Sequence, residues 1–155
     1  MKNSRLQNVG NIVSIFLYVF AVIGILVMLF LYPLTKIFGI HYDLFIIMIY
    51  PCGISFIYLI YQFIKLFETL KINDPFCYEN VTRFKKSMYC ANIITIFVII
   101  ALFISIFKYN YYSLQLKVAI AFIAFLFFCF SVCFYILSCL FNKAHKYKEE
   151  NDLTI

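Results

Sequence analysis

Charged side chains are scarce in this sequence and are missing altogether from four long stretches of it. Only 13% of its 155 residues are Asp, Glu, Lys or Arg, against roughly 25% in an average globular protein. Hydrophobic residues make up 65% of the chain. A water-soluble domain cannot bury so much apolar surface, so we predict one membrane domain over residues 1–155, with no separate soluble domain.

The four uncharged stretches span residues 12–32, 44–64, 88–107 and 118–141. Each reaches the roughly 20 residues that an α-helix needs to cross the hydrocarbon layer of a bilayer. The sequence therefore predicts an all-α membrane protein with four transmembrane helices. The first stretch is longer than the apolar core of a signal peptide, and no A-x-A cleavage site follows it. We therefore interpret it as a membrane helix and not as a cleaved signal peptide.

Positive charge is distributed unevenly between the segments that flank these helices. Ten of the 13 Lys and Arg residues lie before the first helix, between the second and third, or after the fourth. The other three follow the first and third helices. By the positive-inside rule, we predict that both termini and the 65–87 connector are cytoplasmic. This placement accounts for the net charge of +6 without direct binding to nucleic acid.

The 65–87 connector carries signals for two helix ends. Asp74-Pro75 is typical of a helix start, because an Asp side chain accepts from free backbone N–H groups and Pro fits the first turn. Apolar residues keep a helical period before and after this point. We therefore predict two helical arms that meet at a turn near residues 72–74, with Glu79 and Arg83 spaced as a helix ion pair.

The second arm carries an apolar stripe, which consists of Cys77, Val81, Phe84 and Met88. We expect this arm to tilt or to lie at the membrane interface, with lipid against the stripe. Phe76 falls outside the stripe, so it is available to a partner or to the C-terminal tail. We expect that tail to fold back on the connector and to form one composite surface with it.

Few residues inside the four stretches suggest chemistry. Asn92 is the strongest polar feature, and we interpret it as an interhelical hydrogen-bond partner rather than as part of a polar path. Pro51 and Gly53 predict a kink in the second helix, because Pro removes one backbone hydrogen bond.

Potential metal ligands occur only in incomplete sets. Cys129 and Cys133 share a helix face, and His41 lies close to Asp43, but neither pair has the further ligands that a metal site needs. We interpret His145 as a lone solvated histidine. The sequence has no P-loop, G-x-S-x-G, H-E-x-x-H or repeated zinc spacing. We therefore predict no catalytic residue, no metal and no cofactor, and a protein that is not an enzyme.

The connector and the tail carry two short motifs. The first is a P-F-x-x-x-N core, made by Pro75, Phe76 and Asn80, which leads into basic residues. The second is a C-terminal D-L-T-I, made by Asp152, Leu153, Thr154 and Ile155. With these motifs and its four helices, most of the chain resembles a bacterial membrane protein family called domain of unknown function 2975. The resemblance implies a multi-pass protein of the bacterial cytoplasmic (plasma) membrane, often paired with a small helix-turn-helix regulator.

Two interpretations of the function stay open. In the first, the chain is a non-enzymatic regulatory or interaction protein that presents a cytoplasmic surface to a partner protein. We predict that this surface comprises Asp74, Pro75, Phe76, Asn80, Arg83, Asp152, Leu153, Thr154 and Ile155. In the alternative, it is a small oligomeric transporter or channel subunit in which Pro51, Gly53 and Asn92 line a path. The lack of ionisable residues inside the helices argues against that alternative, and self-association of the chain is left open.

Overall fold

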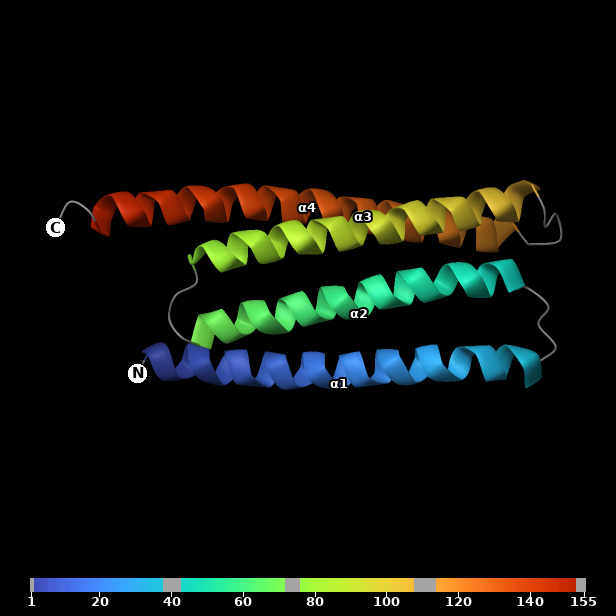
Figure 1. Ribbon diagram of the computed structural model, residues 1–155, viewed down its shortest axis with the longest axis horizontal. Helices are drawn as coiled ribbons and strands as arrows, with labels where there is room; N and C mark the ends of the chain where they lie inside the picture. Colours follow the sequence, from blue (N-terminus) through green and yellow to red (C-terminus); the bar gives the residue numbers. More distant parts are fainter. Residues whose placement is uncertain (1, 38–42, 72–75, 108–113, 153–155) are drawn as a thin grey trace.

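The computed structural model of the chain is all-helical over the residues it describes, which are 2–37, 43–71, 76–107 and 114–152 (Figure 1). The helices are α1 (Lys2–Ile37), α2 (Asp43–Lys71), α3 (Tyr78–Phe107) and α4 (Leu114–Asp152). Each contains a segment long and apolar enough to span a membrane. The predicted all-α protein with four helices able to span a membrane is confirmed, and the chain is a multi-pass membrane protein.

Consecutive helices are neighbours that run in opposite directions (Figure 1). α1 packs on α2, α2 on α3, and α3 on α4. Aromatic side chains also join α4 to α2, because the ring centroids of Phe63 and Phe134 lie 5.6 Å apart and those of Phe56 and Phe127 lie 6.5 Å apart. Thus α2, α3 and α4 share one core, and α1 lies on the outer side of α2.

The core of the bundle lies in the half nearest the connector. Its buried centre consists of Phe84, Ala91 and Phe134, and partly buried apolar side chains from α2, α3 and α4 surround it: Leu59, Phe63, Leu66, Met88, Leu137 and Phe141. Ala91 is fully buried. A residue this small lets two helix backbones approach closely, which is the usual way helices associate in a membrane.

The outer helix α1 exposes most of its large apolar side chains. Ile12, Phe16 and Phe30 are each at least 60% exposed in the isolated chain. These side chains belong to an uncharged apolar segment of α1, so we expect lipid to cover this exposed face.

The connector arms are continuations of the membrane helices rather than separate elements. α2 runs on to Lys71 and α3 begins at Tyr78, so the two predicted arms are confirmed. The expectation that lipid covers the apolar stripe of the second arm is wrong. Val81 and Phe84 are only 1% and 5% exposed, because the stripe packs against α4.

The predicted start of the second arm is also wrong. Asp74 and Pro75 lie outside the described residues, but Phe76 is in a turn, Cys77 is not helical, and α3 begins only at Tyr78. The local cap signal is overridden by tertiary contacts. The backbone carbonyl of Phe76 lies 2.9 Å from His145 Nδ1, which occupies that oxygen with α4 instead of a helical partner.

Candidate functional site

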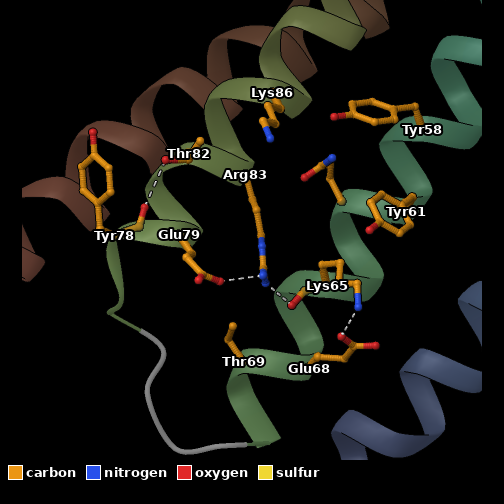
Figure 2. Close-up of a pocket in the computed structure, with 11 residues that line it drawn as sticks. Tyr58, Tyr61, Lys65, Glu68, Thr69, Tyr78, Glu79, Thr82, Arg83 and Lys86 are labelled. Atoms are coloured by element: carbon orange, nitrogen blue, oxygen red, sulfur yellow. Dashed lines mark hydrogen bonds and ion pairs between the residues drawn. The ribbon is translucent and has the colours of Figure 1, made fainter.

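A polar groove separates α2 and α3 at the connector end of the bundle (Figure 2). Its volume is about 670 Å³, and side chains from the last turns of α2 and the first turns of α3 line it. We call it the polar groove; it is lined by Tyr58, Tyr61, Gln62, Lys65, Glu68, Thr69, Tyr78, Glu79, Thr82, Arg83 and Lys86. It gathers charged side chains at the end of the apolar stretches of α2 and α3.

A hydrogen-bonded link across the turn between α2 and α3 adjoins the polar groove at Thr69. Asn80 is 1% exposed, and its side-chain amide donates to the Thr69 hydroxyl at 2.8 Å. That hydroxyl is 2.7 Å from the carbonyl of Leu66 and can donate its single proton there. A buried amide without partners would destabilise the fold by roughly 1–3 kcal/mol, so this link fixes the geometry of the two helix ends.

The guanidinium group of Arg83 connects α3 to α2. Its Nη2 donates to Glu79 at 2.9 Å within α3, the ion pair that the sequence predicts. Its Nη1 donates to the backbone carbonyl of Lys65 on α2. Because α2 continues to Lys71, the Lys65 carbonyl lies within the helix, and the guanidinium uses the second lone pair of that oxygen to connect α3 to α2.

The other charges of the polar groove lie on α2 and on the next turn of α3. Lys65 Nζ lies 2.8 Å from Glu68 Oε2, and Glu68 Oε1 in turn accepts from the Tyr18 hydroxyl of α1 at 3.5 Å. Figure 2 shows Lys86 above Arg83, with its ammonium group turned towards the groove. Three cationic and two anionic side chains therefore line one concave surface.

On the far side of α3, the connector end is packed against α4. The rings of Phe76 and Phe84 lie 5.6 Å and 4.8 Å from that of Phe141. The Ser138 hydroxyl is 3.4 Å from the backbone carbonyl of Val81. His145 meets the carbonyl of Phe76 and lies 3.4 Å from Glu149. The interpretation of His145 as a lone histidine is therefore wrong, because Phe76, Tyr78 and Glu149 surround it.

The tail continues α4 instead of folding back. α4 is helical to Asp152 and projects beyond the ends of α2 and α3 (Figure 1). The predicted fold-back onto the connector is wrong up to that residue, because good helix-forming residues extend the last turn outward. Contact with the connector is made about two and three turns earlier, at His145 and Phe141. Leu153, Thr154 and Ile155 lie outside the described residues.

The predicted surface residues therefore divide into groups. Arg83 lines the polar groove and lies 3.5 Å from the buried Asn80, whereas Phe76 lies on the α4 side of α3, 43% exposed. Asp152 is the last residue of α4. The structure does not bring Phe76 and Asn80 onto one face.

The predicted interhelical contact of Asn92 is confirmed. Its Oδ1 accepts from the Ser131 hydroxyl of α4 at 2.7 Å. Met28 of α1 packs tightly on Gly53 of α2, because a Cβ added at Gly53 would overlap the Met28 side chain. Pro51 is helical and α2 is continuous through it, so the kink stays a prediction.

Several groove residues had no signal in the sequence. Thr69 and the tyrosines of α2 belong to no motif, and the partnership of Thr69 with Asn80 depends on how the turn between them closes. The only available sign was the recurrence of Tyr61 and Tyr58 one and two turns before Lys65, which is typical of a membrane interface. No group of three or more metal-binding His, Cys, Asp or Glu side chains occurs in the described part of the chain.

A family model described as "Protein of unknown function (DUF2975)" matches residues 13–155. The chain belongs to this family. The match begins one residue into the first apolar stretch and includes the other three stretches and the groove residues, and it confirms the resemblance that rests on the connector and tail motifs. No curated protein and no solved structure matches the chain.

Proposed function

We propose that this DUF2975 protein is a non-enzymatic regulatory or interaction protein of the bacterial cytoplasmic membrane, whose connector end docks a cytoplasmic protein. One observation carries the proposal: α4 projects past the bundle as a polar helix, and His145 joins it to the connector at Phe76. A rigid helix of this kind presents side chains at fixed spacing, as recognition of a protein partner requires.

The surface of this projecting helix has the mixed character of a protein contact. Residues 142–152 extend over about 16 Å and carry three Lys, two Glu and one Asp. Tyr147 is 64% exposed, and tyrosine is enriched in the buried centres of protein interfaces. Phe76 and Tyr78, both exposed, extend the same end of the molecule. The family resemblance suggests a small helix-turn-helix regulator as the partner.

The charge distribution supports a cytoplasmic position for this end. Ten of the 13 positive residues lie in the terminal segments and the connector, and the positive-inside rule assigns such segments to the cytoplasm. Two of the residues on which the transporter alternative depends make contacts between helices instead of lining a path. Met28 of α1 packs on Gly53, and Asn92 accepts a hydrogen bond from Ser131.

Site-specific photocrosslinking in bacterial membranes tests the proposal. A photoreactive amino acid replaces Tyr147 or Tyr78 at the connector end, or Tyr135 on the membrane-spanning part of α4, where the side chain is similarly exposed at 58%. We expect one discrete protein adduct from positions 147 and 78 and none from position 135. The captured protein, once purified, must bind the wild-type chain more tightly than a Tyr147→Ala variant. Adducts at position 135 alone, or none at positions 147 and 78, would contradict the proposal.

A further inference from the structure

Four tyrosines mark the level of the polar groove in the membrane. Tyr58, Tyr61, Tyr78 and Tyr89 are between 43% and 60% exposed, and all belong to α2 or α3 at the connector end. Exposed tyrosines gather where the lipid headgroups meet water, because the ring is apolar and the hydroxyl is polar. The polar groove therefore lies at the depth of the headgroups, the part of the bilayer that carries phosphate.

The charges of the polar groove suit a phosphodiester. Three cations and two carboxylates line it, so it has one net positive charge, the complement of a phosphodiester anion. Lys65 and Arg83 each have a carboxylate partner. Lys86 has no ion pair within the described ranges, and in Figure 2 its ammonium group is turned towards the groove. Lys86 is thus the cation that a bound phosphate would neutralise, with a guanidinium nearby.

An apolar groove continues from the polar groove along the same two helices. It has a volume of about 350 Å³ and shares Tyr58 and Lys86 with the polar groove. Beyond these it is lined by Ile54, Ser55, Tyr89, Cys90 and Ile93. Ile93 lies seven residues past Lys86, about 10 Å further along α3, within the apolar stretch. The ligand that fits both grooves therefore has a phosphate at one end and a hydrocarbon chain at the other.

We propose that the α2–α3 cleft binds a glycerophospholipid, with its phosphate against Lys86 and Arg83 and an acyl chain in the apolar groove between Ile54 and Ile93. Free phosphate or a soluble phosphorylated compound would leave the apolar groove unused. An acyl chain alone would leave Lys86 without a counter-charge. The two grooves meet at Tyr58, where the glycerol backbone of the lipid changes from polar to apolar. The site shares Tyr78 with the docking end, but its lipid contacts lie on α2 and α3 rather than on α4.

Native mass spectrometry of the purified full chain in detergent tests the headgroup contact, with added dioleoyl phosphatidylglycerol as the probe. Lys86→Gln removes the groove cation, and Lys85→Gln is the matched control, because Lys85 is exposed on α3 and lines neither groove. We expect K86Q to lower the fraction of chains that retain lipid by about fivefold to tenfold, the effect of one charge-assisted contact. K85Q should stay within about twofold of wild type, the range that screened surface charge explains.

A second pair tests the acyl contact. Ile93→Trp fills the apolar groove, whereas Ile96→Trp adds the same bulk at an exposed position outside it. I93W should lower lipid retention and I96W should not. Inorganic phosphate at millimolar concentration should displace little lipid from the wild-type chain. Equal loss within either pair of variants, or displacement by phosphate, would overturn the proposal.

One further measurement uses the wild-type chain alone, so that it does not depend on whether a variant folds. A phosphatidylglycerol with a photoreactive group in its acyl chain is incorporated into vesicles that contain the protein. Peptide mapping should find the label concentrated at residues 54–58 and 89–93. A label spread evenly over the lipid-facing surface of all four helices would show annular lipid only, and would reject the site.

Discussion

The contact between α3 and α4 differs in kind from the contact between α1 and α2. Between α3 and α4, a 2.7 Å hydrogen bond joins Asn92 to Ser131, and Ala91 is buried completely. Between α1 and α2, the Tyr18 hydroxyl meets Glu68 in a contact that is long at 3.5 Å and exposed. Because lipid removes the hydrophobic drive for helices to associate, close packing and hydrogen bonds decide which helices form the core. α1 packs on α2 at small residues, Gly24 of α1 and Gly53 of α2, and its hydrogen bond to Glu68 is weak.

Removal of one aromatic ring should give the largest difference in stability between the shared core of α2, α3 and α4 and the outer helix α1. Phe134→Ala leaves a cavity in the core shared by α2, α3 and α4, and we expect the free energy of unfolding to fall by about 2 kcal/mol. This is less than the roughly 3–5 kcal/mol seen in soluble cores, because in a membrane the side chain stays in apolar surroundings after unfolding.

Phe30→Ala on α1 is the matched control for that ring removal, since Phe30 is 60% exposed. It should change the stability little. Reversible denaturation in mixed micelles, followed by circular dichroism, measures both variants. Equal losses would show that α1 belongs to the core after all.

A smaller difference is expected from an added methyl group at two glycines of the α1–α2 contact. Gly24→Ala places its Cβ 3.8 Å from Ile57, an ordinary contact, whereas the same change at Gly53 overlaps Met28. Both variants gain the same helix propensity, so their difference isolates packing. We expect Gly53→Ala to be less stable than Gly24→Ala by about 1 kcal/mol, which the same denaturation assay measures. The reverse order would mean that α1 does not sit against Gly53.

The smallest expected effect is the hydrogen bond of Asn92. A double-mutant cycle with Asn92→Ala and Ser131→Ala should give a coupling energy of about 0.6 kcal/mol, the average for such bonds in membranes. Tyr18→Phe, which removes the long contact of α1, should leave stability almost unchanged. A coupling of zero between Asn92 and Ser131 would leave packing alone to explain why α3 and α4 associate.

The four helices could be predicted from the sequence, because long stretches without charge determine where a chain crosses a membrane. Hydropathy alone could not predict where α2 ends and α3 begins. Lys65 and Arg83 lie outside the apolar stretches, yet both residues are helical. The helical period of the apolar stripe did predict this continuation. It could not show whether lipid or α4 covers the stripe, since both are apolar.

The candidate site was only partly predictable. Asn80 and Arg83 stood out by motif and ion-pair spacing, and both line or support the polar groove. Their partners Thr69 and the carbonyl of Lys65 lie across the turn, and no spacing rule connects residues whose distance depends on how that turn closes. His145 had no neighbouring ligand in the sequence, and its contact with Phe76 depends on the register of α4 against α3.

The central claim is that the polar end of the bundle, with the groove and the projecting end of α4, faces the cytoplasm. Fusions to a reporter enzyme that is active only outside the cytoplasm test it directly. Placed after Ile155, the reporter should be inactive, and placed after residue 110, between α3 and α4, it should be active. An active reporter after Ile155 together with an inactive reporter after residue 110 would show the opposite orientation in the membrane. That result would contradict the cytoplasmic docking surface.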